Sequence, residues 1–533
     1  MQPEPARQLL PASNIDRHDA AAGVLLLVIA ILIALTVRHY GISNDEDLQH
    51  RYGEMIIAYY TSGFADRSLF KFDNLYLYGG LFDVAAILIA KVLSTDVFLV
   101  CHVLCALIGL GGIVAAWATA RLIAGPRAGL IAAALLAACG VWYGGMFNHT
   151  KDVPFAAAMI GGTYALVRAT RDLPYPRKRD VLLFGLMLGA ALGIRVMGLL
   201  LGIYLALAIL AGLWISGARG HRDRLAFIGR SLLAFAPALL LAYLMMIAAW
   251  PWAALDPFNP VRAIFAFADF HYNIRDLFAG QVYPMAEMPR WYLPTYVVIK
   301  LPPPVFIGAL LALGFAATPR GLTSRTRLEI AFVAFTVVFP VACQVIGRGP
   351  IFSGMRHFIF IVPPLAVLAG IGCHLLLEKL KRWGRSAAIG GVTIAVMLLL
   401  NAGLLVRLHP HQYLYYNPLV GGLAGANGRY ATDYWFNTMP EAVRALEWFL
   451  AQSGETTDTH YVAICGERRQ FEHIAGPRLR FTDDWDKAEF FVSTTHMACE
   501  NMLEGRVIAF IERLGVVLAV VKDRRAIIAP ASR

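Results

Sequence analysis

The sequence predicts an all-α polytopic membrane protein that ends in a small C-terminal α/β domain. Three observations predict this fold class. Hydrophobic residues make up 58% of the 533 positions and charged residues only 16%, whereas a soluble chain carries about a quarter charged residues. Apolar stretches of about 20 residues, long enough to cross a bilayer as helices, recur up to position 407. Beyond that position, short apolar runs alternate with polar and glycine-rich segments.

The apolar stretches predict about eleven membrane helices. One stretch, 181–216, is too long for a single span, and the residues 193–195 (Gly-Ile-Arg) interrupt it. We therefore expect two helices there, joined by a tight turn. The other predicted spans are 20–37, 97–120, 128–146, 153–170, 228–250, 294–316, 329–346, 357–378 and 386–407.

The Lys and Arg residues predict which side each loop faces. Loops rich in these residues face the cytoplasm, and all of them do so together only if the apolar segment 76–93, which contains Asp83, does not cross the membrane. We therefore expect segment 76–93 to lie at the membrane–water interface on the outer side. The N-terminus of the chain is then inside and its C-terminus outside. The basic loops are 168–180, 219–224, 320–327 and 379–385.

The net charge of +11 does not indicate nucleic-acid binding. The Lys and Arg residues stand mostly in short loops between apolar stretches, where they set the topology and contact membrane lipids. No basic, aromatic-interleaved soluble domain is visible in the sequence. We therefore exclude nucleic acid as a partner.

Acidic residues occur at two places on the predicted outer side. Asp45, Glu46 and Asp47 directly follow the first membrane helix, and Asp152 stands where a helix restarts. A solvated helix N-terminus or an N-cap accounts for each position taken alone. Two carboxylates that converge on one face also suit acid–base catalysis, or a divalent cation that bridges phosphate oxygens. The predicted catalytic residues are Asp45, Glu46 and Asp152.

Cations on the same side predict an anion site. Arg195 lies between apolar helices, where an unpaired guanidinium is costly, and Arg356 flanks a short outer loop. Contact with lipid headgroups is the alternative, which we favour for Arg262 and Lys300. Acids and arginines around a cavity at membrane level suit a substrate that carries a phosphate and a lipid tail. The predicted substrate-binding residues are His149, Lys151, Arg195, Arg290, Tyr292, Arg348, Arg356 and His357.

Four segments occur in a fixed order on this outer side: Asp45-Glu46 with 51–54, the turn 151–155, the segment 289–294, and 354–358 leading to Pro363-Pro364. Together they resemble the GT-C superfamily of glycosyltransferases. The resemblance is closest to the bacterial branch related to dolichyl-phosphate-mannose protein mannosyltransferases and to the lipid A aminoarabinose transferase. It runs through positions ~20–407, the whole membrane part.

The resemblance implies an inverting glycosyltransferase of the bacterial inner membrane with its active site facing the periplasm. Its donor would be a sugar linked to polyprenyl phosphate, and its acceptor a lipid, a glycan or a protein. Asp45 matches the first-loop Asp proposed as the catalytic base of the family, and Asp152 matches the second acid. Segment 76–93 matches the family's juxtamembrane helix.

The resemblance also implies that a divalent metal cation (Mg, Mn or Zn) can take part. The nearest equivalents of the metal ligands in the aminoarabinose branch are Asp73 and His271. That branch has a Lys after the first of these ligands, whereas this chain has Asn74. Phosphate binding must therefore be arranged differently here.

Two other functions are compatible with a polytopic chain. A secondary transporter or flippase usually shows internal repeats and interrupted helices with polar groups at mid-membrane, whereas the clear break here is at Arg195 and the acids lie at the outer edge. A polymerase or ligase of lipid-linked glycans would share the outer arginines. It would not necessarily share the pair of Asp45 and Asp152.

We expect a transmembrane glycosyltransferase domain over 1–407 and a periplasmic α/β domain over 408–533. The aromatic residues at 413–416 predict an anchor at the membrane interface, and residues 433–435 (Asp-Tyr-Trp) are expected to pack within the fold rather than to touch an acceptor. The predicted elements of the second domain are a helix at 438–452 and strands near 459–465, 489–494, 506–511 and 515–521.

Cys465 and Cys499 are the only cysteines of the second domain. In an oxidising compartment such a pair commonly forms a disulfide. Cα atoms more than about 7 Å apart would prevent the bond, so a disulfide and two free thiols both stay open.

Overall fold

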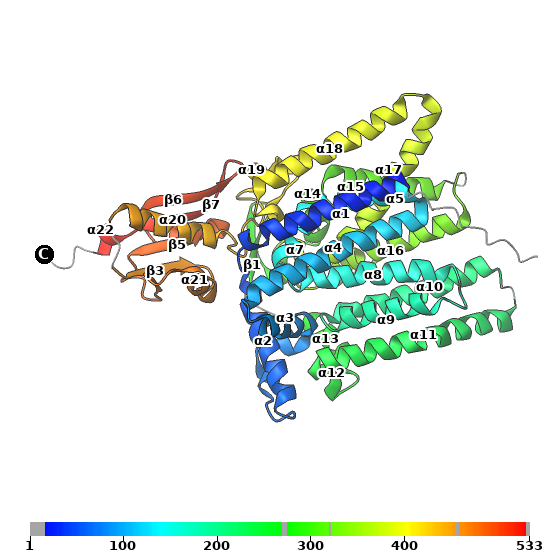
Figure 1. The fold of residues 1–533 in the computed structure, drawn as a ribbon, viewed down its shortest axis with the longest axis horizontal. Helices are drawn as coiled ribbons and strands as arrows, with labels where there is room; N and C mark the ends of the chain where they lie inside the picture. Colours follow the sequence, from blue (N-terminus) through cyan, green and yellow to red (C-terminus); the bar gives the residue numbers. More distant parts are fainter. Residues whose placement is uncertain (1–15, 219, 269–273, 319–320, 455–457, 529–533) are drawn as a thin grey trace, which may run out of the picture.

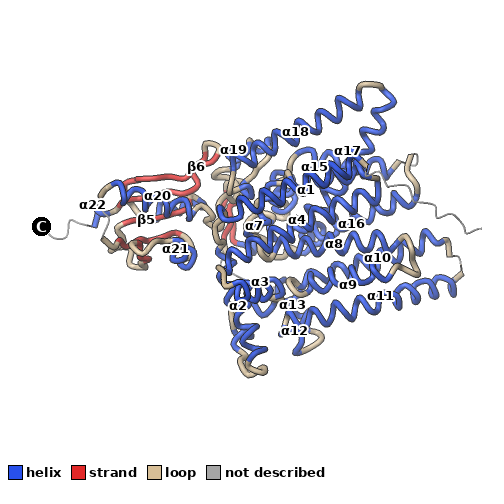
Figure 2. Tube along the Cα trace, viewed as in Figure 1, coloured by secondary structure: helices blue, strands red, loops and turns tan. Residues whose placement is uncertain are grey.

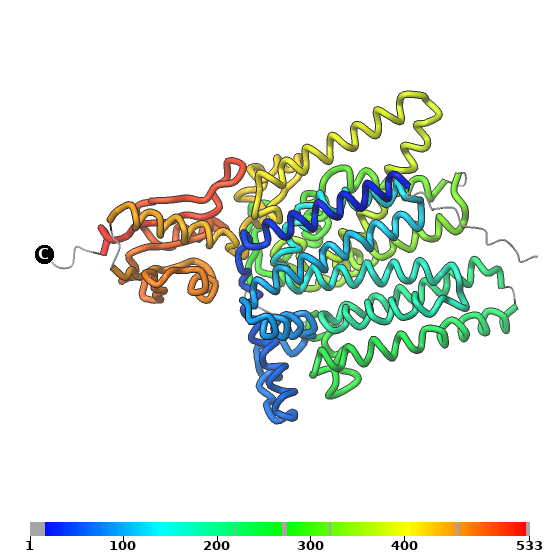
Figure 3. Tube along the Cα trace, viewed as in Figure 1, coloured from blue at the N-terminus to red at the C-terminus, as the bar shows by residue number. Residues whose placement is uncertain are grey.

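A computed structural model describes residues 16–218, 220–268, 274–318, 321–454 and 458–528 of the chain. Long helices lie side by side in one bundle, and a small domain containing a β-sheet is joined to one end of it (Figures 1 and 2). The chain passes back and forth along the bundle before it enters this domain (Figure 3). The predicted fold class is confirmed.

The helices of the bundle follow the predicted apolar stretches. Within the described residues, seven helices are long and apolar enough to cross a membrane. The number rises to nine if each of two bent helix pairs is counted as one span. The bundle contains α1 (Arg17–Thr36), α4 (Val97–Ala124), α5 (Pro126–Ala137), α6 (Gly140–Tyr143), α7 (Gly145–Asn148), α8 (Asp152–Thr170), α9 (Lys178–Leu192), α10 (Leu200–Ser216), α11 (His221–Ala249), α14 (Tyr292–Lys300), α15 (Pro303–Ala317), α16 (Ser324–Gly347), α17 (Val362–Leu380) and α18 (Ser386–Leu408).

Two predicted spans, α8 and α9, are not among those seven to nine segments. Helix α9 has only 15 residues. Helix α8 carries Asp152 and Arg168 near its ends, and nearly all of its side chains are buried. It packs against α4, α9 and α10. Its polar groups therefore face protein rather than lipid, where a membrane helix tolerates them.

The elements between the spans gather at the end of the bundle next to the small domain. Helix α2 (Asn44–Thr61) runs across the ends of the long helices (Figure 1), and α3 (Leu81–Leu93) packs against α2 and α4. Helix α3 has 13 residues, which is too short to cross a bilayer, in agreement with the interfacial position predicted for 76–93. The same end holds α12 (Pro251–Leu255), α13 (Asn259–Ala268) and the hairpin of β1 (Arg275–Phe278) and β2 (Gln281–Pro284).

Two of the basic loops, 168–180 and 379–385, lie at the opposite end of the bundle. The connections from α8 to α9 and from α17 to α18 are both found there, far from the small domain (Figure 1). Ion pairs tie this end together, including Arg168 with Asp180 at 2.9 Å and Arg171 with Glu329 at 2.8 Å. The bundle therefore has one basic end and one end that collects the predicted site residues.

The small domain contains a mixed five-stranded sheet in the order β4-β3-β5-β7-β6. The predicted helix and four predicted strands are confirmed, while β4 and α21 were not predicted. Cys465 and Cys499 form a disulfide with their Cα atoms 6.3 Å apart. The elements are α19 (Gly422–Ala426), α20 (Met439–Gln452), β3 (His460–Cys465), α21 (Arg468–Ile474), β4 (Leu479–Phe481), β5 (Phe490–Thr494), β6 (Arg506–Arg513), β7 (Val516–Asp523) and α22 (Arg525–Ile528).

The segment between α18 and the sheet belongs to the core of the bundle. Tyr413, Tyr415 and Tyr416 are each 2% exposed and pack in the same hydrophobic cluster as the long helices. The prediction that these aromatic residues anchor the chain at the membrane interface was therefore wrong. A separate core of the small domain includes Phe436 and the inner face of the sheet.

Candidate functional site

Two ion pairs stand at the end of the bundle that faces the small domain. Arg356 binds the carboxylate of Asp45, and Arg195 binds the carboxylate of Asp152. Both guanidinium groups and Asp152 are buried, while Asp45 keeps 39% of its side chain exposed. Four of the predicted site residues, distant in the sequence, are therefore brought together in two pairs. Asp45 is the member of these pairs that remains open to a ligand.

The start of α2 assigns separate roles to its three acidic residues. Glu46 accepts a hydrogen bond from the backbone N–H of Ser43 at 2.6 Å, which completes a capping box, and its carboxylate lies 3.0 Å from His102 on α4. Asp47 contacts Arg51 and, across the domain boundary, Arg469. The alternative interpretation, a helix N-terminus, thus accounts for Glu46. We do not retain Glu46 as a catalytic residue.

The Arg195 side chain is placed by the predicted break between α9 and α10. The backbone N–H groups of Gly79 and Leu81 donate to the carbonyls of Ile194 and Gly193, at 3.3 and 3.0 Å. A Cβ atom at Gly79 would lie 2.1 Å from the Gly193 oxygen, so only glycine permits this approach. The turn aims Arg195 at Asp152, whose carboxylate caps no helix end.

Lys151 interacts electrostatically with members of both ion pairs. Its ammonium sits over the ring of Tyr78, 4.0 Å from the centroid. Burial, followed by the charge of Arg195, lowers the pKa of Lys151 to about 8, against the opposing charges of Asp45, Asp83 and Asp152. For Asp45, burial would raise the pKa, but the charges of Arg356 and Lys151 outweigh it and hold the pKa below its usual value. At neutral pH the site thus presents cations around an ionised carboxylate.

His149 is buried beside these charges with no hydrogen bond recorded for either ring nitrogen among the described residues. Its ring meets the ring of Trp435 edge-on, with centroids 4.2 Å apart. Burial and the charge of Arg356 hold the pKa of His149 well below its usual value, so the imidazole is neutral. A buried polar group without a partner is costly, and here it offers a hydrogen bond to a substrate. The predicted His357 places its ring 4.8 Å from that of Phe352.

Tyr292 belongs to a network that shapes the loop before Arg356. Its hydroxyl donates to the buried carboxylate of Asp276 and accepts from the N–H of Gly354 at 2.7 Å. Asp276 also accepts from the N–H of Ser353 at 2.6 Å. Tyr292 therefore positions the loop from within the protein, and its predicted contact with substrate stays a prediction.

Arg290 and Arg348 are both exposed and line one small hollow together with Tyr292 and Gln344. The residues lining this hollow do not include Asp45 or Asp152. The common anion site predicted from the sequence, which includes these two arginines, stays a prediction.

The structure describes only one of the two predicted metal ligands. Asp73 is exposed, with a backbone φ of 49°, and His271 lies outside the described residues. Within the described part of the chain, no group of three or more His, Cys, Asp or Glu residues could hold a metal ion. The residues that the structure describes therefore do not fit a metal centre.

Several residues of the site were not predicted. Lys300 is buried, donates to the carbonyl of Tyr413 at 2.9 Å and lies 3.7 Å from the ring centroid of Tyr416, so the predicted headgroup contact was wrong. A lysine within an apolar helix is itself a signal of function or buried pairing. Tyr434 and Trp435 approach the site from the small domain, and no local sequence pattern indicates this.

Residues 83–252 match the family model "Dolichyl-phosphate-mannose-protein mannosyltransferase". This segment contains α3 from Asp83 onward, α8 with the preceding Lys151, and the turn with Arg195. The chain resembles the GT-C glycosyltransferases. It is an integral membrane protein, as its apolar helices predict. The resemblance stated from the sequence motifs is therefore confirmed.

Several solved structures are similar in fold. ArnT from Cupriavidus metallidurans in the apo state has 17% identity, covers 96% of this chain and 99% of its own, and gives a TM-score of 0.49. The Archaeoglobus fulgidus oligosaccharyltransferase in the apo form has 14% identity, covers 88% of this chain and 69% of its own, and gives a TM-score of 0.47. The arabinofuranosyltransferase AftD from Mycobacteria has 11% identity, covers 95% of this chain and 40% of its own, and gives a TM-score of 0.42. A search of curated proteins finds no match.

Proposed function

We propose that the chain is an inverting glycosyltransferase that moves a sugar from a polyprenyl-phosphate-linked donor to a lipid, glycan or protein acceptor. The reaction takes place at the periplasmic face of a bacterial inner membrane. The observation that carries this proposal is the pairing of Asp45 with Arg356 and of Asp152 with Arg195, next to Lys151. Guanidinium groups and a lysine suit a phosphate, and a carboxylate open to solvent suits proton transfer.

The donor phosphate and the Asp45 carboxylate compete for the guanidinium of Arg356. A donor phosphate that contacts Arg356 and Lys151 replaces the Asp45 carboxylate as the partner of the guanidinium. The negative phosphate then offsets the cations that hold the pKa of Asp45 low, and the carboxylate becomes a better proton acceptor. Binding of the donor thereby frees and activates the base in one step.

Transfer is a single displacement at the anomeric carbon. The acceptor hydroxyl oxygen forms a bond to that carbon while the bond from the carbon to the phosphate oxygen breaks. The hydroxyl proton passes to Asp45, and polyprenyl phosphate leaves with the electron pair, its charge stabilised by Arg356 and Lys151. One displacement inverts the anomeric configuration. Asp152 acts indirectly because it holds Arg195.

A divalent cation (Mg, Mn or Zn) stays a prediction of the family resemblance. Such an ion, when bound, would stabilise charge on the leaving phosphate. The described residues supply no ligand set for it, and the steps above involve only the groups of the chain itself.

The experiment that tests the proposal compares envelope glycolipids and glycoproteins, by mass spectrometry, from cells with the chain, without it, and with Asp45→Asn in its place. We expect one sugar modification to disappear in the second and third samples alike. An identical glycan profile in all three samples would contradict the proposal.

A further inference from the structure

The turn at 433–438 carries Trp435 of the small domain into the site. The Trp435 ring centroid is 5.0 Å from the guanidinium carbon of Arg356, and the Phe352 ring centroid is 5.1 Å from the same atom. The guanidinium that binds Asp45 is thus contacted by two aromatic rings, one from each domain. Because Trp435 also meets His149 edge-on, one side chain touches two groups of the proposed site.

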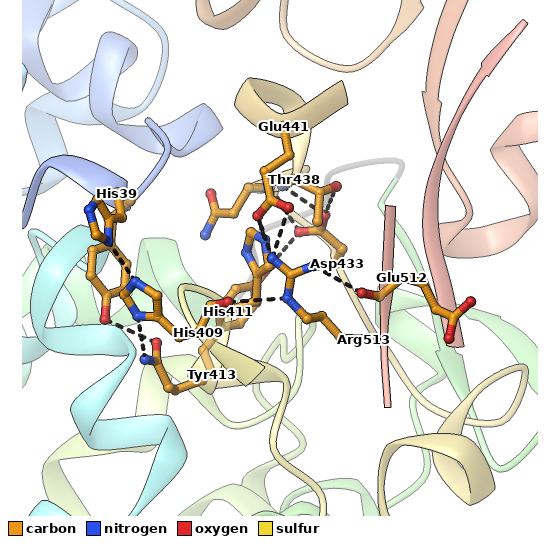
Figure 4. Close-up of polar contacts among 12 residues, drawn as sticks. His39, His409, His411, Tyr413, Asp433, Thr438, Glu441, Glu512 and Arg513 are labelled. Carbon is orange, nitrogen blue, oxygen red and sulfur yellow. Dashed lines mark hydrogen bonds and ion pairs between the residues drawn. The ribbon is translucent and has the colours of Figure 1, made fainter. Parts of the chain in front are cut away.

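Hydrogen bonds to the carboxylate of Asp433 hold the turn that presents Trp435. The buried Asp433 carboxylate accepts from the hydroxyl of Tyr413, from the N–H groups of Asn437 and Thr438 at 2.8 and 3.1 Å, and from the Thr438 hydroxyl at 2.5 Å. Figure 4 shows Tyr413, Asp433 and Thr438 at the junction of the two domains. Since Tyr413 packs in the core of the bundle, the turn is fixed to the membrane part and not only to its own domain.

Further contacts seat the small domain on the elements that carry the site. The Gln470 side chain donates to the carbonyl of Ile42, just before α2, and to that of Phe436 in the turn. On the other side of the junction, Glu441 accepts from Arg513 at 2.7 Å and lies 2.8 Å from His411 (Figure 4). Contacts on two sides leave the turn little freedom to move independently of the site.

We propose that Trp435 is a positioning residue of the transfer reaction, through which the small domain orients Arg356 and His149. This inference rests on the proposed function. The aromatic face beside the guanidinium stabilises it by a cation–π contact, a contact that strengthens when water is excluded, and the ring edge limits the tilt of the buried imidazole. The small domain therefore completes the site instead of merely following the last membrane helix.

The test compares Trp435→Ala, Trp435→Phe and Trp448→Ala in the full-length protein in nanodiscs. Trp448 is a matched control because it lies in the same domain, on α20, with 65% of its surface exposed. Hydrogen exchange of peptides covering 147–152 and 351–357 reports how firmly the backbone segments that carry His149 and Arg356 are held, without any assay of transfer. Turnover of undecaprenyl-phosphate-linked sugars and its pH profile are measured on the same samples.

We expect Trp435→Ala to speed exchange in both peptides and to lower turnover about ten-fold, with the acid limb of the pH profile moved to higher pH because Arg356 holds Asp45 less firmly. Trp435→Phe should restore much of both properties, and Trp448→Ala should leave both unchanged. Unchanged exchange and turnover in Trp435→Ala would overturn the inference. Faster exchange in Trp435→Ala, with no turnover even by the unmodified protein, would support the positioning contact and contradict the proposed function.

Discussion

Arg356 and Asp45, 311 positions apart in the chain, form an ion pair where the membrane helices meet the small domain. The arginine is buried and the aspartate is partly exposed, so the pair has a fixed side and an open side. A phosphate approaching from the open side can take over the guanidinium. In the proposed mechanism, this exchange of partners links donor binding to activation of the base.

Changes at Arg356 should separate charge from geometry. Arg356→Lys keeps the charge but loses the planar group that lies beside two rings, so we expect turnover to fall about ten-fold. Arg356→Ala should lower it by a further order of magnitude, about that found on removing one stabilising group from an active site. Arg444→Lys is the control, because Arg444 is exposed on α20 and belongs to none of the predicted site residues. Equal turnover in Arg356→Lys and the unmodified protein would count against a role for the planar guanidinium group of Arg356.

The pH dependence of activity should report Lys151. Burial lowers the pKa of this residue to about 8, so its positive charge is lost as the pH rises through about 8. Donor affinity should therefore fall above this pH, measured as KM for an undecaprenyl-phosphate-linked sugar. Lys151→Arg keeps the charge at every accessible pH and should move the alkaline limb upward. An alkaline limb that does not respond to Lys151→Arg would exclude Lys151 as the group responsible.

Labelling of single cysteines should establish the two sides of the bundle. A reagent that cannot cross the membrane should reach a cysteine at the exposed positions 65 or 427 in intact spheroplasts, and a cysteine at the exposed position 175 only after the membrane is opened. Residue 175 lies in the connection from α8 to α9, at the end away from the small domain. Labelling of residue 175 from outside would reverse the orientation inferred from the basic loops.

The fold was largely predictable because apolar length and charge bias act locally and independently of tertiary contacts. The break at Arg195 and the interfacial segment 76–93 followed from these two signals. The site was predictable as a set of outer loops but not as a set of pairs. Which carboxylate meets which arginine depends on how four distant loops pack, and that information is absent from any one of them.

Two structural roles near the site had visible signals in the sequence. Ser43 and Glu46 stand three residues apart at the start of α2, the spacing of a capping box, and this pattern indicates a structural role for Glu46. Lys300 stands within an apolar helix, where a buried partner is the usual solution. The approach of Trp435 had no such signal, because it results from docking of a separate core onto the bundle.

Loss of the disulfide between Cys465 and Cys499 should destabilise the small domain. The bond joins residues 34 positions apart, and closure of such a loop stabilises a fold by about 3–4 kcal/mol in the chain-entropy model. Cys465→Ser should therefore lower the first thermal transition of the purified protein, while Cys343→Ser, which removes a free exposed thiol, should not. Mass mapping under non-reducing conditions checks the bond itself, and alkylation of both thiols would disprove it.

The most direct test of the central proposal is the release of undecaprenyl phosphate from a panel of undecaprenyl-phosphate-linked sugars. The purified protein is assayed in nanodiscs with an envelope extract as the source of acceptor. We expect release from at least one donor, and a loss of about 10²–10⁴-fold in Asp45→Asn, the range for removal of a general base. Binding of undecaprenyl phosphate should persist in this variant, and Asp483→Asn, at an exposed position of the small domain, should behave as the unmodified protein. Release that is equally fast in Asp45→Asn, or absent with every donor of the panel, would contradict the account.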